Sequence, residues 1–190
     1  MRLLLASQSP RRRQLIAELG FPVQYINISV DEQRPADLPA AAVAEYLARH
    51  KAAAYPSDKL ADDDVLVTAD TVVVHRDSVL GKPADRNEAI AMLRNLSGDS
   101  HDVYTGVCLR TRHEEHSFTE RTIVHFRPLD DEEIIHYVDH YRPYDKAGSY
   151  GIQEWIGMVG VSGIEGCYYN VMGLPAARLY ESLKKLSLSR

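Results

Sequence analysis

The sequence predicts an α/β fold in which helices flank a mixed sheet with a cleft. Three observations lead to this prediction. Short apolar runs alternate along the chain with segments of helical periodicity. The most apolar runs are rich in β-branched residues. Of the 190 residues, 45% are hydrophobic, which is enough to bury a core. We expect one domain over residues 1–190, formed by two closely joined lobes around the cleft.

The beginning of the chain alternates strand and helix. RLLLAS is a short apolar run bounded by small polar residues, which is typical of a strand. PRRRQLIAELG then places apolar residues at helical spacing before Gly20. FPVQYINISV has the pattern of a second strand, and the alanine-rich LPAAAVAEYLARHKAAAY predicts a helix that ends at Pro56.

The middle of the chain supplies the centre of the sheet. VLVTADTVVVHRDSVLGKP is apolar and β-branched, with a turn at Arg76–Asp77. DRNEAIAMLRNLSG predicts a helix that is capped by Asp85 and closed by Gly98. HDVYTGVCLRT and HSFTERTIVHF together predict an antiparallel hairpin.

The last third begins and ends with helices. DDEEIIHYVDHY is acidic at its start, as a helix N-terminus favours, and stops before Pro143. DKAGSYGIQEWIGMVGVSGIEG is rich in glycine, so we expect loop and short strand there rather than helix. GLPAARLYESLKKL predicts a terminal helix with Lys184 and Lys185 near its C-terminal end.

Charge and cysteine content narrow the class of protein. A net charge of −5 argues against binding to nucleic acid, because phosphate backbones are bound mainly by clustered positive surface. No apolar run approaches the roughly 20 residues that span a bilayer. Cys108 and Cys167 are expected to be reduced thiols, since the chain shows no export signal. We therefore expect a cytoplasmic protein that binds neither nucleic acid nor membrane.

Three consecutive arginines lie just inside the first predicted helix. Ser9 is a suitable N-cap and Pro10 a suitable first helical residue. Arg11, Arg12 and Arg13 then add positive charge where the helix dipole is already positive. A bound phosphate would satisfy the free N–H groups and offset this charge, and the alternative is a set of solvated surface cations.

Asp70 is the main candidate for chemistry. It is expected at the end of the strand VLVTAD, at the edge of the sheet where α/β proteins bind ligands. There its carboxylate can act as a general base or bind a divalent cation, and Thr71 can hydrogen-bond a ligand. The alternative is that Asp70 caps a turn through its own side chain. The sequence alone leaves both open.

The sequence gives weaker evidence of a functional role for four other polar residues. Lys51 and Lys82 are single basic residues that can equally be surface lysines. Glu32 could supply a second carboxylate for a metal, or be one of a solvated acidic pair with Asp31. Gln153 carries an amide complementary to a pyrimidine edge with an N3–H and an O4, or is an exposed glutamine in a glycine-rich loop.

Taken in order, these motifs resemble the Maf family of nucleoside triphosphate pyrophosphatases, also called Maf/septum formation inhibitor proteins. The resemblance covers the whole chain. It rests on LASQSPRRRQLI at the start, VDE at Val30, KA at Lys51, ADTVV at Ala69, GKP at Gly81, YTGV at Tyr104, DKAGSYGIQ at Asp145 and YYNVMGLP at Tyr168.

The resemblance implies a Maf/ITPase-like fold, with an elongated twisted sheet and a central nucleotide-binding cleft. It implies a cytoplasmic hydrolase of the α–β phosphoanhydride bond that uses a divalent metal and forms a homodimer. It assigns Asp70 as proton acceptor. Arg11, Thr71 and Gln153 correspond to positions linked to substrate choice, and their combination is similar to the branch that acts on dTTP and UTP, with modified pyrimidine nucleotides as further substrates.

Residue patterns and resemblance together give one hypothesis. Asp70 activates water, and Glu32 binds Mg²⁺ or Mn²⁺ together with Asp70 or with the phosphates. Gln153 recognises the base. Arg13 is expected to be a solvated side chain. The residues expected to bind phosphate are Ser7, Ser9, Arg11, Arg12, Lys51 and Lys82. The role would be house-cleaning of the nucleotide pool; the alternative is a regulator of cell division or septum formation that binds nucleotide without turnover.

Overall fold

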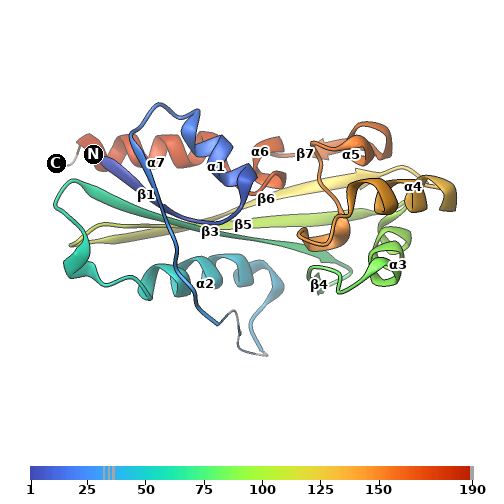
Figure 1. The fold of residues 1–190 in the computed structure, drawn as a ribbon, viewed down its shortest axis with the longest axis horizontal. Coiled ribbons are helices and arrows are strands. Elements are labelled where there is room, and N and C mark those ends of the chain that lie inside the picture. The colour runs from blue at the N-terminus through green and yellow to red at the C-terminus, as the bar shows by residue number, and fades with distance from the viewer. Residues whose placement is uncertain (32, 34, 36, 189–190) are drawn as a thin grey trace. The chain divides into compact units, whose positions relative to one another are not determined.

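A computed structural model of the protein describes residues 1–31, 33, 35 and 37–188. Over these residues, seven strands form one sheet in the order β2-β1-β3-β5-β6-β7, with β4 paired to β3 (Figure 1). The strands are β1 (Arg2–Ala6), β2 (Val23–Ile26), β3 (Asp64–His75), β4 (Ser78–Leu80), β5 (Ser100–Arg110), β6 (Glu115–Phe126) and β7 (Val161–Glu165). The helices are α1 (Pro10–Ala17), α2 (Ala40–Ala53), α3 (Arg86–Leu96), α4 (Asp131–Tyr141), α5 (Trp155–Gly160), α6 (Tyr168–Val171) and α7 (Ala176–Leu188).

The sheet is mixed, as the sequence predicts. β1 is parallel to both of its neighbours, with Leu4 opposite Gln24 of β2 and Leu66 of β3. β4 is antiparallel to β3, and β7 is antiparallel to β6. The α/β fold with flanking helices is therefore confirmed.

The chain forms two compact units. Unit 1 comprises Met1–Asp70, Thr105–Glu120 and Gly173–Arg190, and unit 2 comprises Thr71–Tyr104 and Arg121–Met172. The chain passes from one unit to the other within β3, β5 and β6. No described helix is long and apolar enough to cross a membrane.

In unit 1, α2 lies on one face of the strands, and α1 and α7 lie on the other face (Figure 1). A Cβ added to Gly106 of β5 would lie 2.3 Å from the Ala44 carbonyl carbon and the Glu45 nitrogen of α2. The Thr68 hydroxyl of β3 donates a hydrogen bond of 2.7 Å to the Ala48 carbonyl of the same helix. Glycine at 106 therefore allows α2 to approach β5 closely, and Thr68 fixes the helix on β3.

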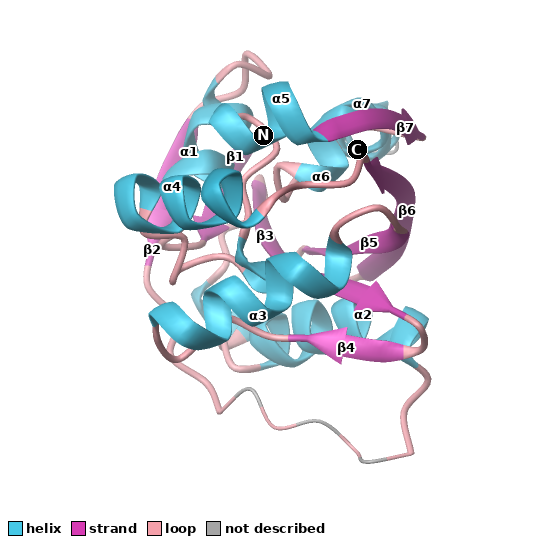
Figure 2. Cartoon of the chain, turned by 90° about the vertical axis from the view of Figure 1, so that its right-hand side faces the viewer, coloured by secondary structure: helices cyan, strands magenta, loops and turns pink. Residues whose placement is uncertain are grey.

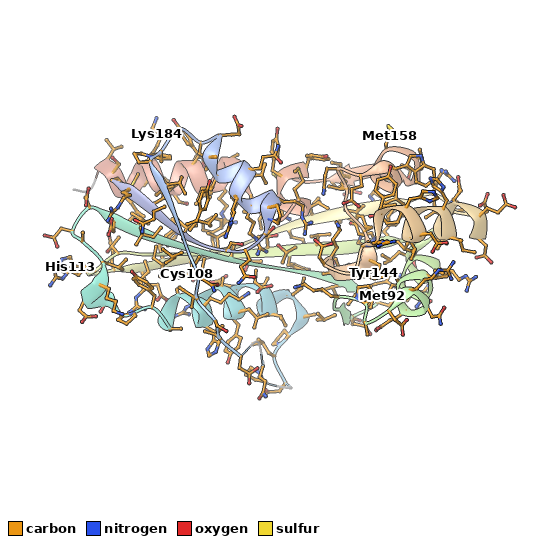
Figure 3. The ribbon with its side chains drawn as sticks, viewed as in Figure 1. Met92, Cys108, His113, Tyr144, Met158 and Lys184 are labelled. Atoms are coloured by element: carbon orange, nitrogen blue, oxygen red, sulfur yellow. The ribbon has the colours of Figure 1, made fainter. Side chains whose placement is uncertain are left out.

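The core of unit 1 includes a buried cysteine thiol. Cys108 packs with apolar side chains of β1, α2 and β3 and is fully buried (Figure 3). Burial raises the pKa of the Cys108 thiol to about 12, because a thiolate would be poorly solvated there. Cys167 in unit 2 is half-buried, and both cysteines are free thiols, as expected.

These environments predict different reactivity toward iodoacetamide. At pH 8, the folded protein is expected to be alkylated at Cys167 and to remain unmodified at Cys108, since the thiolate is the reactive species. Peptide mass spectrometry measures both sites. In urea the two cysteines should react alike, and equal rates in the folded protein would contradict the prediction.

In unit 2, α3, α4 and α5 contribute to one apolar core. The helix caps follow the sequence: Asp85 accepts a hydrogen bond from the Glu88 N–H, and Asp130 and Glu133 form a reciprocal capping box on α4. Arg76 and Asp77 have positive φ in the two-residue turn between β3 and β4, which confirms the predicted turn. Figure 2 shows β4 beside α3.

The prediction of loop and short strand in the glycine-rich segment was partly wrong. β7 is present, but α5 precedes it. Ile156 anchors α5 in the core, and a Cβ on Gly157 would lie 1.8 Å from the Ile152 carbonyl oxygen. Met158 is 76% exposed and projects outward (Figure 3). Six residues are too few to display helical periodicity, so close packing rather than sequence pattern reveals this helix.

Candidate active site

The N-terminus of α1 has the local structure that the sequence predicts. The Ser9 hydroxyl accepts a hydrogen bond of 3.4 Å from the Arg12 N–H, and Pro10 occupies the first helical position. The Ser7 hydroxyl accepts from the Ser9 N–H at 3.2 Å. Two serines thus shape the loop between β1 and α1, which presents the arginine-bearing end of the helix.

The three arginines differ in their contacts. Arg12 donates through Nε to the Gly173 carbonyl at 2.8 Å, which joins α1 to the VMGLP segment. Arg13 donates through Nε to the Ser7 carbonyl at 3.0 Å, and its guanidinium lies 5.1 Å from the Tyr25 ring centroid. Arg13 is exposed, in keeping with the expectation of a solvated side chain, but it also contacts the loop before α1 and Tyr25. Arg11 is half-buried.

Asp70 lies within β3 rather than at the end of a strand, so that expectation was also wrong. The β-branched residues from Thr71 onward continue the strand to His75, and they outweigh any tendency of an aspartate to start a turn. The alternative of a turn-capping role is excluded by the same observation. Asp70 nevertheless keeps 15% of its side chain exposed.

Lys51 and Asp70 form an ion pair. The Lys51 ammonium donates a hydrogen bond to Asp70 Oδ2, and the two side chains are only 16% and 15% exposed. Lys51 lies on α2, so the contact depends on the position of that helix. Thr68 fixes α2 on the sheet, and Gly106 allows α2 to approach β5 closely. A base candidate and a cation candidate from separate sequence motifs are thus brought into direct contact in unit 1.

The other predicted residues fall in unit 2 or outside the described residues. Thr71 follows Asp70 along β3, so its side chain points to the opposite face of the strand. Lys82 follows β4 and is exposed, and Gln153 is exposed in the turn before α5. The Gly148 N–H donates to the Gly81 carbonyl at 3.1 Å, which brings the GKP and DKAGSYGIQ segments together. Glu32 lies outside the described residues.

A buried polar cluster that no sequence motif indicates lies beside Gln153. Tyr137 of α4, Lys146 and Glu154 form it. The lysine and the glutamate are visible in the DKAGSYGIQE segment, but a tyrosine on a separate helix has no local signal that links it to them.

The protein family of this chain follows from a match to a family model. The family model described as Maf-like protein matches residues 2–186. The chain belongs to the Maf family. The resemblance inferred from the motifs is confirmed over nearly the whole sequence.

Relatives of this Maf-family chain match it over almost their full length. A Bacteroides fragilis protein named dTTP/UTP pyrophosphatase is 52% identical over 97% of this chain and 96% of its own length. A protein of the same name from Bacteroides thetaiotaomicron is 52% identical, and one from Flavobacterium johnsoniae is 42% identical. Each match covers 97% of this chain and 95% of the relative.

A solved structure supports the fold of this Maf-family chain. The HAM1 protein from Coxiella burnetii matches with a TM-score of 0.50 at 16% identity, over 97% of this chain and 99% of the other. At that identity the likeness concerns the fold alone, and it agrees with the ITPase-like architecture expected from the sequence.

Proposed function

We propose that this protein is a nucleoside triphosphate pyrophosphatase that hydrolyses dTTP and UTP to the monophosphate and pyrophosphate. The observation that carries the proposal is the full-length identity of 52% to the Bacteroides fragilis dTTP/UTP pyrophosphatase. Modified pyrimidine nucleotides are proposed as further substrates, which gives the enzyme a house-cleaning role in the nucleotide pool.

In the proposed reaction, Asp70 is the proton acceptor. Its carboxylate takes a proton from water as the water oxygen bonds to the α-phosphorus. The bond from the α-phosphorus to the bridging oxygen then breaks, and pyrophosphate leaves with the electron pair. Lys51 touches this carboxylate, so the same contact places a cation where negative charge develops.

The triphosphate is proposed to bind at the start of α1. The Ser7 and Ser9 loop, the helix N-terminus and the Arg11 and Arg12 guanidinium groups all favour an anion. Lys51 and Lys82 are proposed as further phosphate ligands.

The metal is proposed to be Mg²⁺ or Mn²⁺, held by Glu32 together with either Asp70 or the phosphates of the substrate. Carboxylate oxygens are the hard donors that these ions prefer. Among residues 1–31, 33, 35 and 37–188, no group of three or more His, Cys, Asp or Glu is placed to hold a metal. The bound ion would offset the charge of the triphosphate.

Base selection is proposed to depend on Gln153, with Arg11 and Thr71 as further specificity residues. The amide of Gln153 can donate to O4 and accept from N3–H of uracil or thymine. Cytosine presents the reverse pattern, an N4 donor and an N3 acceptor. Discrimination therefore requires that the amide has a defined direction.

The test is a panel of purified nucleoside triphosphates incubated with the protein and Mg²⁺ or Mn²⁺, with pyrophosphate measured. We expect release from dTTP and UTP above the other nucleotides. Absence of pyrophosphate throughout, with nucleotide binding by calorimetry, would overturn the enzyme and favour the division or septum regulator.

The contacts of the arginines predict distinct phenotypes. Arg11→Ala is expected to raise the KM for UTP about tenfold or more, because a charge-assisted contact to phosphate is lost. Arg13→Ala should change the KM less and lower the melting temperature, since it removes the Ser7 carbonyl and Tyr25 contacts. Steady-state kinetics and thermal melts measure both, and an equal rise of the KM in Arg13→Ala would contradict this division of roles.

We further propose a cytoplasmic location and a homodimer for the enzyme. Light scattering after size-exclusion chromatography measures the mass in solution, and the mass of a single 21.4 kDa chain at all concentrations would overturn the dimer.

A further inference from the structure

The turn that carries Gln153 is fixed from beneath by a buried tyrosine. The Tyr137 hydroxyl of α4 donates to Glu154 Oε2 and accepts a hydrogen bond of 3.0 Å from the Gly151 N–H. The Glu154 N–H in turn donates to the Gly151 carbonyl at 3.0 Å. One phenol therefore contacts both ends of the four-residue turn, and Gln153 lies between them.

The positively charged ammonium of Lys146 also belongs to this cluster. This ammonium lies 3.1 Å from Glu154 Oε1 and 2.7 Å from Asp145 Oδ1, and the Lys146 side chain is only 8% exposed. Glu154 thus has a tyrosine on one oxygen and a lysine on the other. Burial and the neighbouring carboxylate raise the pKa of Tyr137, so the phenol keeps its proton and remains the donor to Glu154.

The side chains of the turn are packed against its glycine. A Cβ on Gly151 would lie 3.0 Å from the Gln153 Nε2 and 2.9 Å from the Glu154 carboxyl carbon. The backbone of Gly151 thus borders the Gln153 amide directly. Any side chain at position 151 would displace the amide or the carboxylate.

We propose that Tyr137, Lys146 and Glu154, here called the Tyr137 cluster, are positioning residues that set the direction of the Gln153 amide for uracil and thymine against cytosine. This inference rests on the proposed role of Gln153 in base recognition. None of the three needs to touch the nucleotide. The turn, held at both ends, restricts the backbone from which Gln153 projects, and the Gly151 backbone beside Nε2 restricts rotation of the amide. Both restraints lower the entropy lost on binding and disfavour the reversed amide that cytosine requires.

The first test is Tyr137→Phe, which removes the hydroxyl and keeps the ring. We expect the KM for UTP to rise about tenfold, the kcat to stay within about twofold, and the preference in kcat/KM for UTP over CTP to fall about tenfold. Tyr141→Phe is the matched control: it removes a hydroxyl one turn further along α4, from a residue that is 40% exposed, and should leave all three quantities unchanged.

The second test keeps all three residues of the Tyr137 cluster. Gly151→Ala places a methyl group against flexible side-chain ends, so the fold should persist while the UTP preference falls. This variant keeps the inference testable if Tyr137→Phe folds poorly. A parent-like UTP preference in Gly151→Ala, or in a folded Tyr137→Phe, would overturn the inference.

A double-mutant cycle separates this inference from the proposed function. If the Tyr137 cluster acts through Gln153, Tyr137→Phe should reduce the UTP preference in the parent but not in a Gln153→Ala background. An equal reduction in both backgrounds would overturn the inference and leave the role of Gln153 intact. A parent-like UTP preference in Gln153→Ala alone would overturn the role of Gln153 itself, and the inference with it.

Discussion

Asp70→Asn is expected to lower the kcat for dTTP and UTP by a factor of about 10²–10⁴, which is the usual contribution of a general base. The amide is nearly the same size as the carboxylate and can still accept the hydrogen bond from Lys51, but it cannot take a proton from water. The KM should change less, because the proposed phosphate ligands remain. Pyrophosphate release at saturating UTP measures the effect.

Folding must be checked separately for this variant, because the change also replaces an ion pair with a neutral contact. Asp63→Asn is the matched control: this carboxylate directly precedes β3 and is 71% exposed. It should retain parent kinetics. If Asp70→Asn shows a parent melting temperature and more than about a tenth of the parent kcat, Asp70 is not the proton acceptor.

The sequence predicts the elements of this protein well where a local signal exists. The cap at Ser9, the turn at Arg76–Asp77 and the capping of α3 by Asp85 depend on a few adjacent residues, and all three are confirmed. At Asp70 the local signals conflict. The residues before it suggest a strand that ends there, whereas the β-branched run after it indicates that the strand continues, as the structure has it.

The contacts of the candidate site are harder to predict, because they join residues distant in the sequence. Lys51 and Asp70 belong to separate sequence motifs, and they come into contact only because α2 packs on the sheet. Arg12 contacts Gly173 from the other end of the chain, and Tyr137 reaches Glu154 from another helix. Periodicity indicates which residues share a face of an element but not which elements become neighbours, so these pairs need the structure.

Gly106→Ala is expected to destabilise the protein by about 3 kcal/mol, although it adds only one methyl group. The added carbon would lie 2.3 Å from backbone atoms of Ala44 and Glu45, and a helix backbone cannot move aside as a side-chain end can. α2 must shift as a whole. Urea unfolding measures the loss in the free energy of unfolding.

The same shift should reduce activity, because Lys51 lies roughly two turns further along α2 and would leave Asp70. Gly163→Ala in β7 is the matched control: its added Cβ would meet only His125, at an ordinary 3.7 Å, so stability should stay within about 1 kcal/mol of the parent. Equal stability of the two variants would show that α2 does not require glycine beneath it. A destabilised Gly106→Ala with the parent kcat would show instead that the Lys51–Asp70 contact tolerates movement of the helix. The expected result, loss of both, makes the glycine of YTGV a packing residue that acts on the candidate site through the position of α2.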